Sequence, residues 1–212
     1  MHTLLVAAST RMSAEERREQ VIAVASRLMA EQGIGATPTV EVAEQSGISH
    51  AYLFRLFPTK QALVTAVVER CNEEIHDAFK TAADRARAAG EDVLLAIGMA
   101  YGGLLSDPRR LLLQLHAHAL SPRDPDVRAA MQASFRRLFA LVQRETDATP
   151  DEIRRFFAHG MLMNVLAATG IASLDEPFAD VLRTGELNGE SCFPDDFVAS
   201  PLDPAAEEAP TA

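Results

Sequence analysis

The sequence predicts an all-α chain: an N-terminal three-helix module joined by a long helix to an all-helical second domain, followed by an acidic tail. Apolar residues recur at helical spacing, and Gly, Pro and capping residues separate the segments. Hydrophobic residues make up 48% and charged residues 24% of the 212 positions, which is typical of a globular protein. We place the three parts at residues 13–60, 61–184 and 185–212.

The first helix is expected to begin at Ser13, because Glu16 three residues later completes a capping box. It carries an apolar stripe and is expected to end at Gly33. The residues before it lack the basic start and the long apolar core of a signal peptide. Both Met1 and Met12 remain open as translation starts.

Two short helices follow, and the link between them has helix-turn-helix spacing. Thr37 is expected to cap the second helix, with Pro38 in its first turn. The small Ala43 is followed four positions later by Gly47, which suits a tight turn, then by the apolar Ile48 and by Ser49, which caps the third helix. Such a unit is either a DNA-binding element or an ordinary helical hairpin, and the spacing alone leaves both open.

The remaining helices are predicted from breakers and caps. A long helix follows Pro58-Thr59 and runs without Gly or Pro to about Ala89. Further helices are expected at about 91–105, 108–120, 125–146, 150–172 and 177–184. The acidic tail is rich in Pro, Gly, Asp and Glu, and we expect it to be mostly disordered.

The net charge of −10 is unevenly distributed. Residues 175–212 hold one basic and ten acidic side chains, whereas residues 1–60 hold six of each, so the acidic total does not exclude nucleic-acid binding by the front of the molecule. Two cysteines cannot form a disulfide framework or a four-Cys zinc site, and they suit a reducing compartment. The longest apolar stretch, Met161–Ala172, is too short to span a membrane. We expect a cytoplasmic protein.

Residues 18–63 resemble the TetR-type bacterial transcription regulators. The matching positions are Val21-Ile22, Ala25, Leu28-Met29, Gly33, Thr37, Val42-Ala43, Gly47-Ile48-Ser49, Leu53-Phe54, Phe57-Pro58, Lys60 and Leu63. Beyond them the chain resembles the family only in architecture. The resemblance implies a DNA-binding module, and a second domain that dimerises and binds a small effector.

The resemblance also implies roles for individual residues. The helix from Ser49 to Leu56 would enter the major groove, and the others would contact bases or phosphates. The implied DNA-binding residues are Thr37, Thr39, Ser49, His50, Ala51, Tyr52, Arg55 and Lys60. The chain departs from the family at Phe54, where Tyr is usual, and at Leu56, where Tyr or His is frequent. Neither side chain can donate a hydrogen bond to phosphate.

Two sets of residues in the second domain are candidates for the other functions. We expect the effector pocket to involve Met99, Tyr101, His116, Phe135 and Met163. Helical spacing and small residues place a dimer interface on the helices at 125–146 and 150–172, with Phe135, Leu138, Phe157, Gly160, Met161, Asn164 and Ala168.

The sequence therefore predicts a ligand-responsive regulator, more specifically a repressor, that binds a palindromic double-stranded DNA operator as a homodimer and is released by an unidentified small-molecule effector. We expect no catalytic residue, cofactor, metal or membrane partner. A helical ligand-binding or scaffold protein that has lost DNA binding is the alternative, favoured by Phe54. A helical enzyme rests only on Glu73 and His76, which form one half of a di-iron motif that has no second copy.

Overall fold

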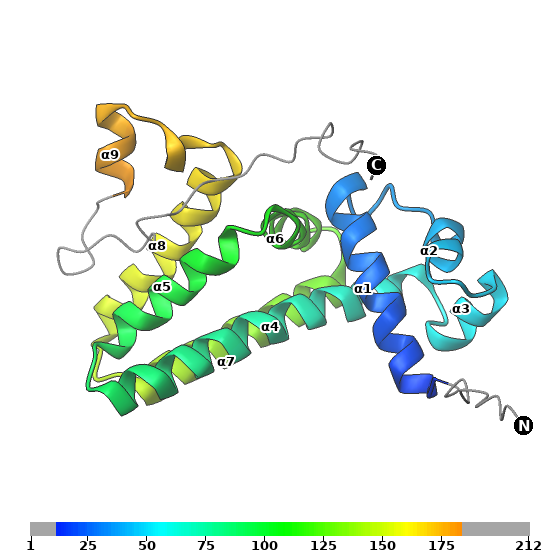
Figure 1. The fold of residues 1–212 in the computed structure, drawn as a ribbon, viewed down its shortest axis with the longest axis horizontal. Coiled ribbons are helices and arrows are strands. Elements are labelled where there is room, and N and C mark those ends of the chain that lie inside the picture. The colour runs from blue at the N-terminus through cyan, green and yellow to red at the C-terminus, as the bar shows by residue number, and fades with distance from the viewer. Residues whose placement is uncertain (1–11, 184–212) are drawn as a thin grey trace, which may run out of the picture.

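The computed structural model describes residues 12–183, and every regular element in that range is helical (Figure 1). The elements are α1 (Ala14–Gln32), α2 (Thr39–Gln45), α3 (His50–Leu56), α4 (Lys60–Ala89), α5 (Val93–Leu105), α6 (Pro108–Leu120), α7 (Pro125–Glu145), α8 (Pro150–Ala168), the 3-10 helix η1 (Ile171–Ser173) and α9 (Pro177–Arg183). The all-α prediction is confirmed. The choice of start and the tail 185–212 lie outside the described residues.

The predicted helix-turn-helix is formed by α2 and α3, which pack beside α1. Ser13 and Glu16 form the expected capping box on α1. Gly47 has φ of 66°, in the left-handed region that favours glycine, and the Ser49 side chain accepts a hydrogen bond from the Tyr52 amide. These local features turn α3 so that Leu53 faces the core.

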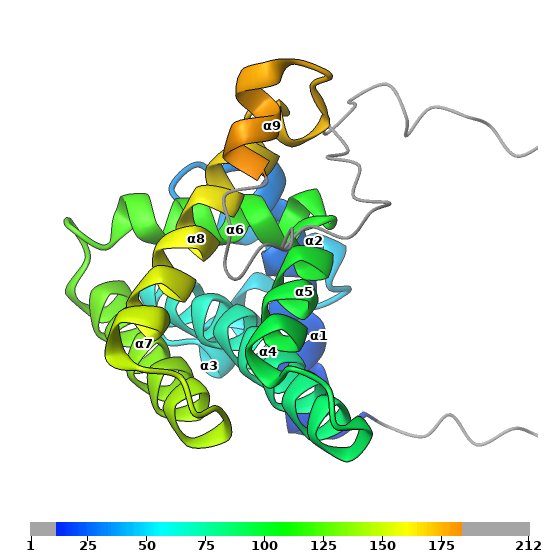
Figure 2. The ribbon, with the colours of Figure 1, turned by 90° about the vertical axis from the view of Figure 1, so that its left-hand side faces the viewer.

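Helix α4 links the module to the second domain over 30 residues. The Thr59 side chain caps its start, and Gly90 ends it in a left-handed conformation. Figure 2 shows α4 and α7 side by side beneath α5 and α8, with α6 crossing the bundle. The buried apolar side chains of α4 belong to one continuous core that extends from α1 to α8.

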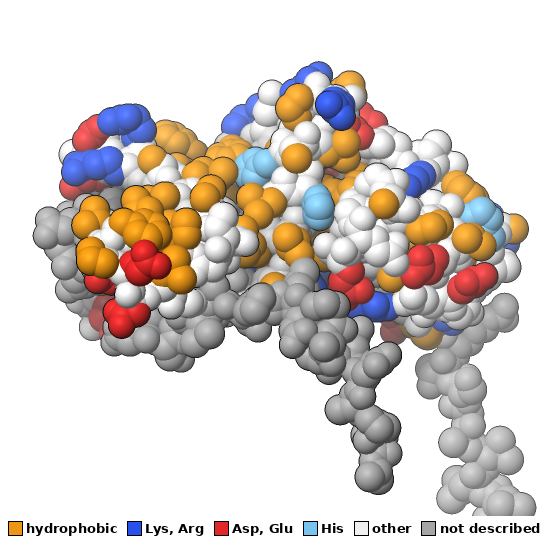
Figure 3. Space-filling model, turned by 90° about the horizontal axis from the view of Figure 1, so that it is seen from above, with side chains coloured by type: hydrophobic (Ala, Val, Ile, Leu, Met, Phe, Trp, Pro, Cys, Tyr) orange, Lys and Arg blue, Asp and Glu red, His pale blue; other side chains and the backbone are white. Residues whose placement is uncertain are grey.

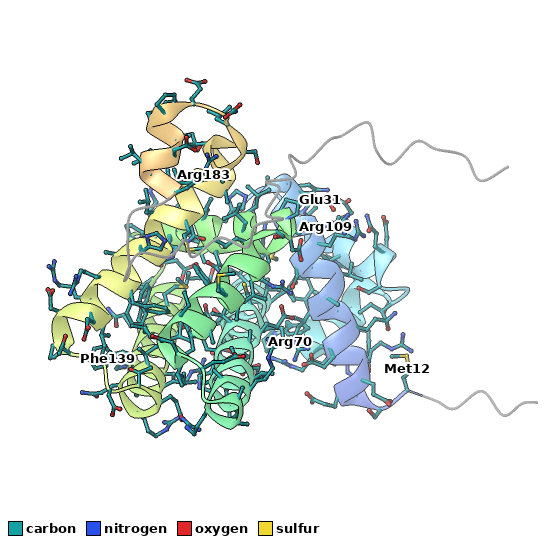
Figure 4. The ribbon with its side chains drawn as sticks, turned by 60° about the vertical axis from the view of Figure 1, so that its left-hand side comes forward. Met12, Glu31, Arg70, Arg109, Phe139 and Arg183 are labelled. Carbon is teal, nitrogen blue, oxygen red and sulfur yellow. The ribbon has the colours of Figure 1, made fainter. Side chains whose placement is uncertain are left out.

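Helix α6 joins the second domain to the module through α1. Arg109 Nε of α6 lies 3.1 Å from Glu31 Oε1 of α1, and Arg70 Nη1 of α4 lies 3.6 Å from Glu19 Oε2 of α1 (Figure 4). The His116 ring lies close to Gly33, where a Cβ would be 3.7 Å from ring atom Cε1. Exposed ion pairs contribute only about 0–1 kcal/mol each to the free energy of unfolding. The main effect of these two pairs is therefore on the orientation of α1, and their effect on stability is small.

Two details differ from the sequence prediction. Thr37 does not cap α2: the N-cap residue is Pro38, the helix begins at Thr39, and no side chain caps it. Thr37 is instead buried in the loop before the helix. The helix expected over 150–172 ends at Ala168, because Gly170 adopts φ of 71° and starts η1.

We predict that Gly47→Ala lowers the free energy of unfolding by about 1 kcal/mol, because a residue with a Cβ is strained at this positive φ. Gly35→Ala is the matched control. Both glycines have nothing within 4 Å of an added Cβ, but Gly35 is not in the left-handed region. Urea unfolding measures both, and an equal effect of the two substitutions would contradict the backbone explanation.

Candidate DNA-binding surface and ligand cavity

Helix α3 carries four of the eight residues predicted to contact DNA, and Ser49, a fifth, is its N-cap. His50, Ala51 and Arg55 are exposed, and Tyr52 is half-buried. The His50 ring nitrogen Nε2 lies 2.9 Å from Thr39 Oγ1, so a hydrogen bond joins the starts of α2 and α3. The Arg55 guanidinium lies 5.6 Å from the centre of the Tyr52 ring. The surface therefore offers hydrogen-bonding groups that are already held by their neighbours.

Phe54 lies on α3, and Lys60 is the first residue of α4. Phe54 is 36% exposed, and its ring meets the His50 ring edge-on at 4.9 Å. The Lys60 ammonium donates a hydrogen bond of 2.8 Å to the Gly35 carbonyl, which holds the start of α4 against the loop before α2. An ammonium has three donors, so two remain for other acceptors such as phosphate oxygens.

Thr37 lies apart from the other predicted DNA-binding residues. It is 1% exposed, and its hydroxyl donates to the Gly33 carbonyl at 3.0 Å, with the Leu28 carbonyl at 3.3 Å. The hydroxyl is thus oriented into the protein, where it fixes the loop between α1 and α2. We therefore leave Thr37 out of the DNA-binding surface proposed below.

A cavity of about 60 Å³ lies in the second domain between α4, α5, α6, α7 and α8. Its wall is mainly apolar, and it includes Phe79, Tyr101, Phe135, Phe156 and Phe157 together with Met131, Met161 and Met163. Of the residues predicted for a pocket, Tyr101, Phe135 and Met163 line this cavity, whereas Met99 and His116 do not. His116 faces α1 instead.

Gln114, His118 and His159 also line the cavity, although they are outside the set of pocket residues predicted from the sequence. Gln114 and His118 are four residues apart, so they share one face of α6, while His116 lies on another face. That spacing is the signal that could have selected His118 over His116. No signal in the sequence links His159 of α8 to α6.

A chain of hydrogen bonds crosses the cavity wall from α8 through α5 to α6. Asn164 Nδ2 donates to the Tyr101 hydroxyl at 2.7 Å and to the Gly160 carbonyl at 2.9 Å. The Tyr101 hydroxyl in turn donates to Gln114 Oε1 at 2.9 Å. This chain of hydrogen bonds leaves the buried Gln114 Nε2 without a partner among the residues that the structure describes.

Burial also determines the charge of the cavity. It lowers the pKa of the His118 and His159 side chains, which favours their neutral forms. Burial is the main reason that the pKa of Tyr101 rises to about 12, so its hydroxyl keeps its proton at neutral pH. Among residues 12–183, no Asp, Glu, Lys or Arg lines the cavity. The wall is therefore uncharged near pH 7.

The residues predicted to form a dimer interface fall into two groups. Phe135 and Met161 are exposed, as is Ala168, and Phe157 is half-buried. Leu138 and Asn164 are buried within the protomer, and a Cβ on Gly160 would lie 3.4 Å from the Tyr101 ring. Gly160 and Asn164 therefore serve packing against α5, because their side of α8 faces inward.

The exposed apolar face of α7 and α8 includes residues that were not in the predicted set. Phe139 is 44% and Val165 49% exposed, and Figure 4 shows Phe139 on α7 at the side of the bundle away from α1. Leu174, Phe178 and Val181 form a second exposed group, and Figure 3 shows hydrophobic side chains gathered at the end that carries α9.

Within residues 12–183, no group of three or more His, Cys, Asp or Glu side chains is placed to hold a metal ion. None of the helices in this range is both long and apolar enough to cross a membrane. Glu73 is exposed on α4, and the His76 ring lies 3.6 Å from Asp77 rather than within such a group.

Comparison with known proteins gives a family for the N-terminal module. Residues 21–67 match the model of the bacterial regulatory proteins of the tetR family. Over 64 residues the chain is 34% identical to the nucleoid occlusion factor SlmA of Mannheimia succiniciproducens. That alignment covers 30% of this chain and 30% of the relative, so most of both proteins lies outside it.

Solved structures share the fold over most of the chain. A TetR-family member from Streptomyces coelicolor A3 has a TM-score of 0.61 at 22% identity and covers 79% of this chain and 96% of its own. A protein from Saccharomonospora viridis solved in complex with choline has a TM-score of 0.61 at 17% identity, covering 81% and 93%. The multidrug binding protein EbrR, complexed with proflavin, has a TM-score of 0.56 at 22% identity, covering 78% and 97%.

Together these findings define a helix-turn-helix protein with an all-helical second domain. Residues 21–67 match the model of the tetR family of bacterial regulatory proteins, and the later helices share the fold of solved TetR-family structures. The resemblance noted from the sequence is confirmed.

We predict that Thr37→Val destabilises the protein by about 1 kcal/mol, because two carbonyls lose a buried hydroxyl donor. Thr39→Val, the same chemical change on a half-exposed residue, is the control and should change the free energy of unfolding by less than about 0.5 kcal/mol. Urea denaturation of both variants measures the difference. Equal losses would show that the Thr37 hydroxyl does not fix the loop.

Proposed function

We propose that this protein is a ligand-responsive transcription repressor that binds a palindromic operator as a homodimer and dissociates when a small effector binds. The observation that carries this proposal is the exposed start of α3, capped by Ser49, within a module that matches the TetR family. We assign the module to residues 13–60 and the effector and dimer domain to residues 61–184.

In the proposed complex, α3 enters the major groove with its N-terminal turn toward the base edges. His50 and Tyr52 are the base-reading candidates, and Ala51 permits close approach to the bases. Ser49 holds the turn by capping it. Thr39, Arg55 and Lys60 lie around this turn and would bind phosphates, which position the module without reading sequence.

The homodimer would place two α3 helices about 34–36 Å apart, or a multiple of that distance, to meet successive major grooves. The exposed apolar side chains of α7 and α8 support this assembly, because apolar surface of this kind is characteristic of an interface between subunits. We assign the interface to Phe135, Phe139, Phe157, Met161, Val165 and Ala168.

The cavity is the proposed effector site, and α6 is the element through which it would act. Gln114 and His118 of α6 line the cavity, while Arg109 and His116 of the same helix contact α1. A ligand that favours a different position of α6 would move the module relative to its partner. The affinity for the operator would then fall, and the size of this fall is limited by how much more tightly the ligand binds that state than the DNA-binding state.

Mobility shift on DNA upstream of the protein's own gene tests the proposal. Binding to one palindromic segment, with a protein dimer on each DNA, would support it. The second candidate function is a ligand-binding protein that does not bind DNA, and Phe54 favours it because a phosphate-binding hydroxyl is absent there. Failure to bind any upstream segment at low salt would favour this second function.

We predict that Lys60→Ala weakens operator binding without changing the preferred sequence, because a phosphate contact carries no base information. The slope of log affinity against log salt should fall in magnitude by about one phosphate contact, roughly 0.9. Lys80→Ala is the matched control, since Lys80 is the other lysine of the chain and pairs with Asp84 on the outer part of α4. Fluorescence anisotropy at several salt concentrations gives both slopes. An unchanged slope in the Lys60 variant would remove Lys60 from the DNA-binding surface.

We predict that Val165→Arg yields a folded monomer with little operator affinity, because it places unpaired charges in the proposed interface. Val40→Arg is the control: the two valines are 49% and 47% exposed, but Val40 lies on α2. Light scattering at micromolar concentration reports the oligomeric state. If the Val165 variant stays dimeric, the interface lies elsewhere. Gly160→Arg is a poorer test, because it would clash with Tyr101 within one protomer.

A further inference from the structure

Two buried polar atoms of residues that line the cavity, Gln114 Nε2 and His159 Nε2, have no hydrogen-bond partner among the described residues, and the surrounding hydrogen bonds identify the first as a donor. The Gly160 carbonyl can only accept, so the Asn164 atom that bonds to it must be the amide nitrogen. That nitrogen also donates to the Tyr101 hydroxyl, which leaves the hydroxyl proton for Gln114. Gln114 must therefore accept through Oε1 and present Nε2 as a donor.

The environment of this donor makes it costly to leave unpaired. Gln114 is 5% exposed, and its Nε2 has no hydrogen-bond partner within residues 12–183. Phe79, Phe156 and Met163 of the same cavity supply no strong acceptor. A ligand atom that accepts from Nε2 would recover the lost hydrogen bond, whereas an entirely apolar ligand would not.

The same wall disfavours charged ligands. The described part of the chain supplies this wall with no acidic side chain to pair with a cation and no Lys or Arg to pair with an anion. His118 and His159 are the titratable groups that could pair with an anion, and burial favours their neutral forms. A charge taken into such a site without a partner loses its hydration and gains little in return.

The size of the cavity limits the ligand further. Its volume of about 60 Å³ is below the ~150 Å³ of an apolar cavity that holds benzene, so a ring can enter only if side chains move. Phe135 and Met161 line the cavity and are also 41% and 38% exposed, so they can swing toward solvent. Met131 adds a flexible side chain that adapts to irregular shapes.

We infer that the effector of this protein is an uncharged, mainly apolar compound of small size whose carbonyl-type oxygen accepts a hydrogen bond from Gln114 Nε2. This inference rests on the proposed effector site. It sets the chain apart from the structural neighbours that were solved with proflavin and with choline, which are both cations.

Four probes of similar size test the inference on the full-length protein: acetophenone, isopropylbenzene, benzoate and phenyltrimethylammonium. Dissociation constants from ligand-observed NMR titrations at pH 7.5 should rank acetophenone ahead of both ions by about tenfold or more. This comparison uses the wild-type protein and needs no variant. Tighter or equal binding of either ion, or no binding of acetophenone up to its solubility, would overturn the inference.

Gln114→Leu tests the hydrogen bond itself. The ratio of acetophenone to isopropylbenzene affinity should fall by about tenfold in this variant, because the donor is lost while the apolar wall remains. Gln143→Leu, on the exposed side of α7, is the matched control and should leave the ratio unchanged. An unchanged ratio in the Gln114 variant would overturn the assignment of the donor.

A parallel titration with operator DNA separates this inference from the proposed function. If the protein binds no operator but keeps the preference for acetophenone, the regulator proposal fails and the ligand class stands. If the protein binds operator but prefers an ion, the ligand class fails and the regulator proposal stands.

Discussion

Burial of α4 along nearly its whole length is the constraint on which the rest of the structure depends. Leu63 and Val67, near its start, are fully buried with the helix-turn-helix module, and Ile75 and Phe79 pack into the second domain. Both ends belong to one hydrophobic core, and cores of native density do not deform continuously. The module therefore cannot turn independently of the bundle. A change in how the bundle packs must either be absorbed locally or be passed along α4 to the DNA-binding end.

Helix α6 is the second path between the two domains, and its geometry follows from helical periodicity. Gln114 and His118 share the face toward the cavity, whereas His116 lies on the face toward Gly33 at the end of α1. A rotation of this helix about its axis would change both contacts at once. The ion pair between Arg109 and Glu31 lies at the solvent edge of the same contact, where a rearrangement costs little because exposed pairs are weak.

Local chemistry explains which features the sequence could predict. The capping box at Ser13, the cap at Ser49 and the turn at Gly47 depend on residues within a few positions, so their spacing is sufficient to place α1 and α3. The sequence prediction for Thr37 is wrong because a threonine before Pro resembles an N-cap, whereas its hydroxyl bonds to carbonyls at the end of the preceding helix.

The sequence places Asn164 in an interface because small and polar residues at four-residue spacing suit close helix packing. The helix that approaches it is α5 of the same protomer, a long-range contact that no pattern within α8 encodes. That His159 of α8 lines the same cavity as α6 is inaccessible to sequence reasoning for the same reason.

The charge balance of the module has a consequence for how the proposed regulator would work. Residues 1–60 carry equal numbers of basic and acidic side chains, so a single module gains little general attraction to the DNA backbone. In the proposed dimer, useful affinity would come from holding two modules at one operator, since the second binds as a tethered partner at high effective concentration. This gain in affinity is lost when the spacing of the two modules no longer lets both of them bind the operator.

Phe135 and Met161 line the cavity and also belong to the exposed face of α7 and α8 proposed as the interface. A ligand that displaces these two side chains would thus act directly on the surface that sets the spacing of the modules, in addition to the path through α6.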